Sequence, residues 1–275
     1  MPNVDRGAAE RPVLPHTIMC SEVWGANGNV AHSMELPGLQ AWVYSAPIEL
    51  GQNGGDIHYL SVCDHGLLCR VALADVSGHG RAVSSVAERL LSLMRRHVNR
   101  IEQREFLHEL SDSLHKMNSA KDMTFATALV LGFDSRSGEL VFTNAGHPPP
   151  LWYRADKTCW GWLQQTTSDT RDGLPLGMDF FGSSYADTVV ELGVGDLLIC
   201  YTDGLSEAVD ATGHELGGDG LIDLARTLPV EPPMAAGATL LGLVDAFRRG
   251  DAALDDETLV VLQRPRLMAD LSANS

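Results

Sequence analysis

The sequence predicts an α+β fold in which antiparallel sheets carry helices on their outer faces. Strand-like runs follow one another directly, with turn residues between them, as in residues 57–63 and 67–74. Helical patterns come in blocks between groups of strands and do not alternate with single strands, as they would in a parallel doubly wound sheet. The 275 residues show no repeat or low-complexity linker. We therefore expect one domain over residues 17–265, with tails at 1–16 and 266–275.

The expected strands are short runs rich in β-branched and aromatic residues. In chain order they cover residues 40–45, 57–63, 67–74, 125–133, 139–144, 196–202 and 258–263, with further short strands around Trp160, Trp162, Tyr185 and Val189.

Apolar residues at helical spacing predict a helix over residues 80–98, with Ser77 as its candidate N-cap, and a second helix over 102–117. Two more helices are expected near 219–228 and 234–249. The blocks fall between strand groups, which supports the layered arrangement.

The first hairpin sets a register that can be worked out from residue numbers. Asp64-His65-Gly66 is a turn signal, and with His65 and Gly66 as a two-residue loop, facing residues have numbers that sum to 131. Asp56 and Asp75 satisfy this sum. Opposed residues of an antiparallel pair have Cα atoms roughly 4.5–5.5 Å apart. Two carboxylates at that spacing repel unless one is protonated or a cation lies between them, so the hairpin predicts a divalent-metal site.

The bulk composition restricts the classes of partner. A net charge of −16 argues against nucleic acid or an anionic membrane as the main partner. The N-terminus lacks the apolar region of a signal peptide, and no window resembles a transmembrane helix. Five scattered cysteines without metal-binding spacing indicate a reduced, cytoplasmic protein.

Four acidic sites share one relation to the predicted strands. Asp56 begins a strand and Asp75 ends one, while Asp203 ends a strand and Asp255-Asp256 precede one. In an antiparallel sheet the start of one strand and the end of its neighbour lie on the same edge, so all four sites are expected at one rim. Oxygen ligands of this kind suit Mg²⁺ or Mn²⁺. Taken singly, each aspartate is equally well explained as a turn residue, because its side chain bonds nearby backbone groups.

The ordered set of motifs is more specific than its members. It runs GGD (54–56), ADVSGHG (74–80), NAGHPP (144–149), TDGLSE (202–207) and DDET (255–258). This set resembles the SpoIIE/RsbU-like branch of the metal-dependent protein phosphatases (the PPM, or type 2C, serine/threonine class). The resemblance covers residues 50–264 and implies a four-layer α-β-β-α sandwich of two antiparallel sheets with two divalent cations, Mn²⁺ or Mg²⁺, at one end.

The resemblance also implies a role for individual residues. Asp75 would bridge both metals, Asp56 and the backbone carbonyl of Val76 would bind the second metal, and Asp203 and Asp255 would bind the first. The residues expected to support these ligands or to contact substrate are Asp256, Gly55, Ser77, His79, His147 and Gly204.

The chain departs from the family pattern at three places. Ile57-His58-Tyr59-Leu60 follows GGD without the usual acidic residue. Ser77 stands where the eukaryotic enzymes have a histidine thought to act as general acid, and this role is not transferred to His79. His147 replaces an aspartate that can hold a third metal, so the resemblance is carried over only for two.

The function that follows is hydrolysis of a phosphoserine or phosphothreonine, with the two metals lowering the pKa of a bridging water to give the attacking hydroxide. The chain shows neither a cysteine-phosphatase loop nor a P-loop. The branch implies a phosphorylated anti-anti-sigma (STAS-type) protein as substrate in a bacterial partner switch, with a separate regulatory protein or a homodimer as regulator. Two alternatives stay open: a non-catalytic phosphatase-like scaffold, and a phosphohydrolase acting on small molecules.

Overall fold

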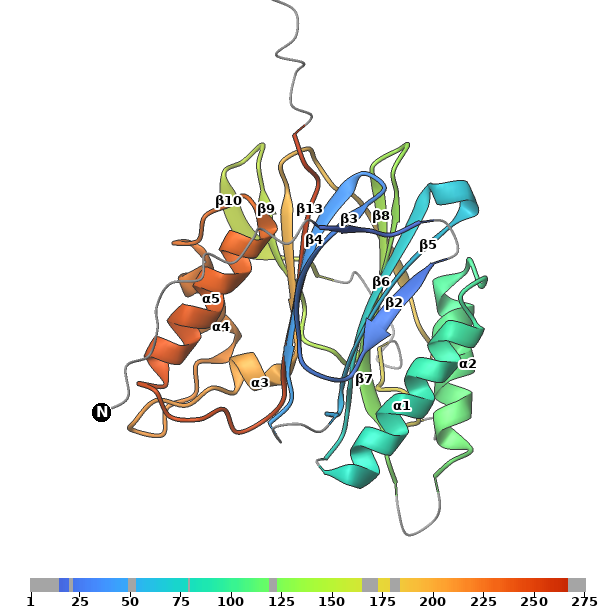
Figure 1. The fold of residues 1–275 in the computed structure, drawn as a ribbon, viewed down its shortest axis with the longest axis horizontal. Coiled ribbons are helices and arrows are strands. Elements are labelled where there is room, and N and C mark those ends of the chain that lie inside the picture. Colours follow the sequence, from blue (N-terminus) through green and yellow to red (C-terminus); the bar gives the residue numbers. More distant parts are fainter. Residues whose placement is uncertain are drawn as a thin grey trace, which may run out of the picture.

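The computed structural model describes residues 15–19, 22–48, 53–78, 80–118, 123–164, 173–178 and 184–266. Two β-sheets lie face to face in the middle of the molecule, and helices cover the outer face of each (Figure 1). The expected α+β fold of four layers is therefore confirmed. Of the predicted tails, residues 1–14 and 267–275 lie outside the described residues.

Both sheets are antiparallel except for one short parallel pair, β1 with β3. The seven-stranded sheet has the order β1 (His16–Thr17), β3 (Val30–Leu36), β4 (Leu39–Ala46), β13 (Glu257–Gln263), β12 (Leu197–Tyr201), β9 (Leu151–Arg154), β10 (Cys159–Trp162). The six-stranded sheet has the order β11 (Asp187–Glu191), β8 (Glu139–Ala145), β7 (Ala126–Asp134), β6 (Leu68–Val76), β5 (Asp56–Cys63), β2 (Val23–Ala26).

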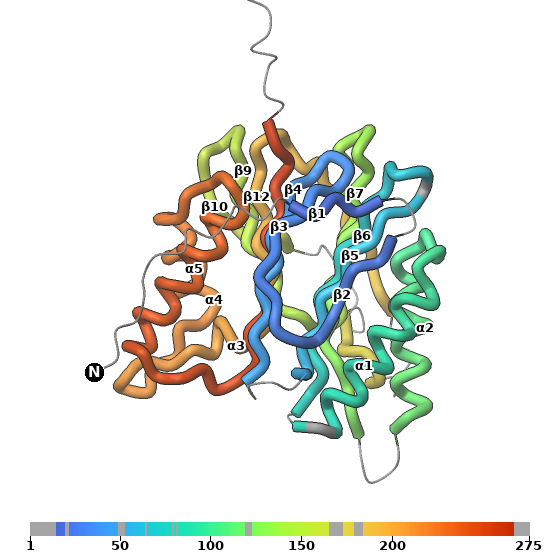
Figure 2. The backbone as a smooth tube through the Cα atoms, in the orientation of Figure 1, coloured from blue at the N-terminus to red at the C-terminus, as the bar shows by residue number. Residues whose placement is uncertain are grey.

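The helices form the two outer layers. Helices α1 (Arg81–Arg96) and α2 (Gln103–His115) pack on the six-stranded sheet, and α4 (Gly217–Ala225) and α5 (Pro233–Phe247) pack on the seven-stranded sheet. The short helix α3 (Asp203–Ser206) follows β12 directly. The tube in Figure 2 shows β2 and β3, which follow one another in the chain, lying in different sheets.

Strand alternation explains why the central strands are apolar along their whole length. On β5, Ile57 and Tyr59 face the helices, while Leu60 and Val62 face the opposite sheet. Because both faces are buried, polar side chains are confined to the strand ends and to a few internal sites. The strand ends are therefore where chemistry is to be sought.

The sequence missed several short elements and one cap. The resemblance implied first strands within residues 17–49 without giving the bounds of β2 or β3, and neither strand β9 nor helix α3 was expected. Helix α1 begins at Arg81 with Gly80 at its N-cap position, so the expected capping by Ser77 is wrong. The Ser77 hydroxyl accepts the Phe125 N–H at 3.2 Å instead, and the Ser77 N–H donates to the Phe125 carbonyl at 2.9 Å. These bonds hold the end of β6 to the start of β7.

The predicted hairpin register is confirmed throughout β5 and β6, from Asp56 opposite Asp75 to Cys63 opposite Leu68. His65 (φ 55°, ψ 28°) and Gly66 (φ 86°) both have positive φ. This is the backbone that a type I′ turn requires, and it suits the twist of the flanking strands. No described helix is long and apolar enough to cross a membrane.

A buried ion pair joins α5 to β13 and gives a test of the packing. Arg248, with 4 % of its side chain exposed, forms an ion pair with Glu257, which is 8 % exposed. We expect Glu257→Ala to lower the free energy of unfolding by about 3 kcal/mol, because it leaves a buried guanidinium without its partner. Urea unfolding measures this.

Asp245 supplies the matched control, since it also lies 3.5 Å from Arg248 but is 69 % exposed. Asp245→Ala should change the unfolding free energy by less than about 1 kcal/mol. Equal effects of the two substitutions would contradict the interpretation.

Candidate metal centre

Two of the predicted aspartates meet at one end of the six-stranded sheet. Asp56 is the first residue of β5 and Asp75 is the second-last of β6, and the two are directly opposed. Thr127 on β7 lies opposite Asp75 on its other side. Because opposed residues point to the same face, Asp56, Asp75 and Thr127 form one row across three strands.

The other predicted aspartates come from the seven-stranded sheet. Asp203 follows β12, and Asp255 and Asp256 precede β13, which pairs with β12. Thr202 holds these ends together: its N–H donates to the Thr258 carbonyl at 3.0 Å and its hydroxyl accepts the Thr258 N–H at 2.9 Å. The same hydroxyl donates to Asp56 Oδ2 at 2.6 Å. This bond joins the two sheets at the site.

Asp255 and Asp256 occupy different environments. Asp256 is 9 % exposed, and its two carboxylate oxygens accept the N–H groups of Ile48 at 2.7 Å and Gly55 at 2.6 Å. The Asp255 carboxylate is exposed and accepts the Asp256 N–H at 2.8 Å. Asp256 therefore links the segments that contain Ile48 and Gly55, while the carboxylate of Asp255 lies at the surface.

Glycines bring the motif backbones into contact. The Gly55 carbonyl accepts the Val76 N–H at 3.3 Å, and a Cβ at Gly55 would lie 3.0 Å from the Val76 carbonyl oxygen and 3.6 Å from Asp75 Oδ1. A Cβ at Gly204 would overlap the Asp256 carbonyl oxygen. Both positions need glycine for this close approach.

The acidic side chains of both sheets act on one another. Burial raises the pKa of Asp75 to about 7, and four further carboxylates act in the same direction: Asp203, Asp255, Asp256 and Glu207. Burial and Asp75 raise the pKa of Asp56 well above its ordinary range, and hydrogen bonds from Thr202 and Thr258 oppose this only in part. Burial, followed by Asp255, raises the pKa of Asp203. Excess negative charge therefore collects at this rim.

The donor set fits divalent metal ions in its chemistry. It offers carboxylate oxygens and the Val76 carbonyl, which are hard ligands, and every resolved influence on the pKa of Asp75 reflects uncompensated burial or negative charge. In the described part of the chain, however, no three His, Cys, Asp or Glu side chains stand in a ready-made coordination geometry. Carboxylates of like charge repel unless one is protonated or a cation lies between them, so a ready-made cage is not expected without metal.

His147 lies behind the row and not on the surface. It is 4 % exposed, and burial lowers its pKa to about 4, with the Tyr201 backbone opposing the effect only in part. Its Nδ1 lies 2.8 Å from the Thr127 hydroxyl. Asn144 fixes the loop, because its side chain accepts the His147 N–H at 2.7 Å and donates to the His147 carbonyl at 2.8 Å. His147 is thus buried and contacts Thr127, next to Asp75.

The remaining predicted residues are placed as follows. Ser77 follows β6 and bonds Phe125, as described above, and His79 lies outside the described residues. Thr202, Thr127 and Glu207 also lie at the site, and no role was predicted for them. Thr202 immediately precedes Asp203 in the TDG motif, which is the signal that was available for it.

The chain is similar to known proteins in sequence and in fold. The family model described as Stage II sporulation protein E (SpoIIE) matches residues 68–265. The phosphoserine phosphatase RsbP of Bacillus subtilis (strain 168) is 26 % identical over 223 residues, which is 80 % of this chain and 50 % of RsbP. The chain thus spans about half the length of that curated relative.

Two solved structures share the fold. The RsbU and RsbW domains of Rv1364c from Mycobacterium tuberculosis superpose with a TM-score of 0.66 at 24 % identity, covering 87 % of this chain and 63 % of that one. The catalytic domain of the serine/threonine protein phosphatase PstP, in complex with two manganese ions, gives a TM-score of 0.55 at 16 % identity, covering 82 % and 97 %.

The bond from Thr202 to Asp56 predicts a stability effect. Thr202→Val removes a donor to a buried carboxylate and leaves the Thr258 N–H unpaired, so the free energy of unfolding should fall by about 2 kcal/mol. Thr202→Ser keeps the hydroxyl and should lose less than half of that. Urea unfolding in EDTA tests the pair, and equal losses would contradict the role of the hydroxyl.

The buried imidazole of His147 predicts a pH effect. Its pKa falls from 6.5 to about 4 on folding, so between these values the unfolded chain binds the extra proton. The unfolding free energy should therefore drop by about 1 kcal/mol for each pH unit from pH 6.5 down to 4. His147→Gln should lack this contribution, which is read as the difference between the two proteins across the pH range. A constant difference would contradict the assignment.

Proposed function

Because the chain belongs to the SpoIIE family, we propose that it is a metal-dependent phosphoserine/phosphothreonine protein phosphatase. The observation that carries the proposal is the meeting of carboxylates from both sheets at one rim, where burial and these neighbouring carboxylates together raise the pKa of Asp75 to about 7. A site of this kind gains stability when cations bind, and attack by a metal-bound water needs no side-chain nucleophile.

The ligands that we propose are Asp56, Asp75, the Val76 carbonyl, Asp203 and Asp255, for two Mn²⁺ or Mg²⁺ ions. When bound, such ions supply Lewis acidity and a water of lowered pKa for attack on a phosphate ester. The residues of the chain hold this arrangement in place. Thr202 orients Asp56 through its hydroxyl.

Asp256 and His147 have supporting roles in this proposal. Asp256 anchors Gly55 and Ile48 through both carboxylate oxygens, which leaves Asp255 as the ligand from this pair. His147 is neutral near pH 7 because its pKa is about 4, so it adds no charge beside Thr127 and Asp75.

The substrate that we propose is a phosphorylated STAS-type anti-anti-sigma protein in the cytoplasm. Family membership and the similarity to RsbP and to the RsbU domain of Rv1364c support this class. A comparison of initial rates on a phosphorylated STAS protein and on free nucleoside phosphates distinguishes it from a small-molecule phosphohydrolase. Faster turnover of the nucleotide would overturn it.

A substitution at Asp75 separates metal binding from folding. Asp75→Asn should lower kcat/KM for Mn²⁺-dependent hydrolysis of a phosphoserine peptide by at least about 10²-fold, because a proposed metal ligand is lost. The same change should raise the unfolding free energy in EDTA by about 1 kcal/mol or more, since it removes one charge from a repelling cluster.

Thermal unfolding with and without Mn²⁺ completes this test. Mn²⁺ should raise the Tm of the wild-type protein and not that of Asp75→Asn. Asp223→Asn, an exposed acid on α4, is the control that should change neither property. Activity retained by Asp75→Asn would contradict the proposed mechanism. If Mn²⁺ did not change the Tm of the wild-type protein, the non-catalytic scaffold would be the better interpretation.

A further inference from the structure

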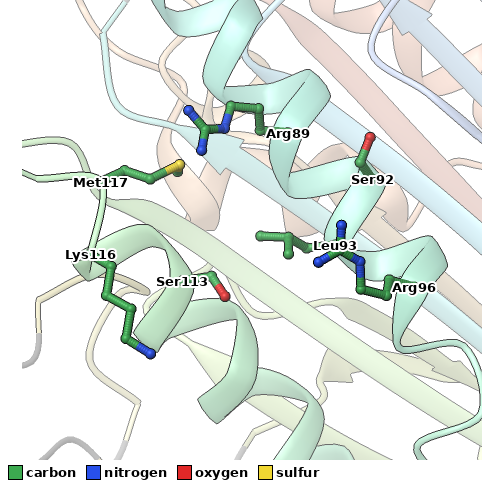
Figure 3. Close-up of a pocket in the computed structure, with 7 residues that line it drawn as sticks. All are labelled: Arg89, Ser92, Leu93, Arg96, Ser113, Lys116 and Met117. Atoms are coloured by element: carbon green, nitrogen blue, oxygen red, sulfur yellow. The ribbon is translucent and has the colours of Figure 1, made fainter.

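A groove between α1 and α2 carries a concentration of positive charge that the proposed function does not use. It has a volume of about 410 Å³ and is lined by Arg89, Ser92, Leu93, Arg96, Ser113, Lys116 and Met117. Figure 3 shows the α1 side chains Arg89, Leu93 and Arg96 facing Ser113 and Met117 on the α2 side. We propose that this groove is the docking surface for an acidic, amphipathic helical segment of a partner protein.

The lining stripe of α1 lies beside the stripe that packs on the sheet, and Leu93 borders both. The core face of α1 consists of Val83, Ala87, Leu90, Leu91 and Met94. Arg89, Leu93 and Arg96 are spaced by four and three residues and so form a second face of the helix, two turns long. Leu93 and Met117 are only partly buried and form an apolar strip between the cations.

The charge of the groove is opposite to that of the protein. The chain has 36 acidic and 20 basic residues, yet three of the seven lining residues are cations and none is acidic. Within the described residues, the side chains of Arg89, Arg96 and Lys116 have no ion pair. Helix polarity favours Arg96 and Lys116 at the ends of their helices, but it does not account for Arg89 in the middle of α1.

Among anionic ligands, these features favour a protein segment over a small ion or a nucleic acid. Arg89, Arg96 and Lys116 are exposed, so each contributes little to binding a small ion. A net charge of −16 repels extended polyanions such as nucleic acid. A helix with an apolar stripe flanked by carboxylates matches both the apolar strip and the cations, and a helix lying in a groove between two others is a common recognition mode.

The groove lies away from the acidic rim. Val83, in the first turn of α1, packs close to Gly55 at the rim. Arg89 and Arg96 follow six and thirteen residues later, which at 1.5 Å per residue places them about 9 and 20 Å further along the helix. A segment in the groove therefore leaves the proposed catalytic end open.

The test uses a fluorescein-labelled peptide of about 15 residues, designed as a helix with glutamates flanking a leucine stripe. Fluorescence anisotropy should show binding to the wild-type protein that weakens as salt rises from about 50 to 300 mM. The double variant Arg89→Ala/Arg96→Ala should bind at least about tenfold more weakly. The control Arg226→Ala/Arg249→Ala removes the same two charges elsewhere and should bind as the wild type does.

Further experiments test whether something other than an acidic helix binds in the groove. A peptide with lysines in place of the glutamates should not bind. Equal binding of the acidic peptide to both double variants, or no binding to the wild-type protein, overturns the proposal. So does a wild-type dimer in sedimentation equilibrium that Arg89→Ala/Arg96→Ala alone dissociates, because the occupant is then a second copy. Tm and Mn²⁺-dependent hydrolysis should be unchanged in both variants, so a failure here is distinct from a failure of the phosphatase proposal.

Discussion

The direct opposition of Asp56 and Asp75 across β5 and β6 is the constraint on which the site depends. Two unit charges about 5 Å apart repel by about 3 kcal/mol at an effective dielectric constant of 20. One hydrogen bond to a carboxylate, such as that from Thr202, returns about 1.5–3 kcal/mol. It offsets one such repulsion, but Asp75 also faces Asp203, Asp255, Asp256 and Glu207. The remaining repulsion is relieved either by protonation of a carboxyl group or by bound cations.

Packing of the core sets the register of β5 and β6, and the repulsion between Asp56 and Asp75 cannot shift it. Moving β5 by one residue relative to β6 would turn Ile57 and Tyr59 away from the helices and into the face of the opposite sheet. The core therefore determines the register, and the register determines where the two carboxylates lie. The Thr202–Thr258 pair and the two backbone bonds to Asp256 fix the other half of the site in the same way. Ligands placed on strand ends are more rigid than ligands on loops.

The sequence predicted the features that depend on residues close together in the chain, and not those that depend on distant residues. The His65-Gly66 turn and the two-residue period of strands determine the Asp56–Asp75 pairing, and the structure has that register. The bond from Thr202 to Asp56 spans 146 positions, and that between Thr127 and His147 depends on the packing of a loop behind β7. No local pattern encodes either contact. Strand β9 has only four residues, too few for an alternating pattern to be recognised. Ser77 does not cap α1 because its hydroxyl bonds Phe125 instead.

The distribution of charge along α1 connects the rim and the groove. The first turn of α1 packs beside the acidic rim, and its later turns carry Arg89 and Arg96. If both proposals hold, a phosphorylated, acidic protein would be repelled at the metal-free rim and attracted to the groove. Two divalent cations at the rim would reverse the local sign of the field, since bound cations are the largest charges in such a site. The bound cations would then let a phosphate group approach the rim, while the groove would keep its sign in both states. The groove would act on a partner at encounter, and the rim only once it holds cations.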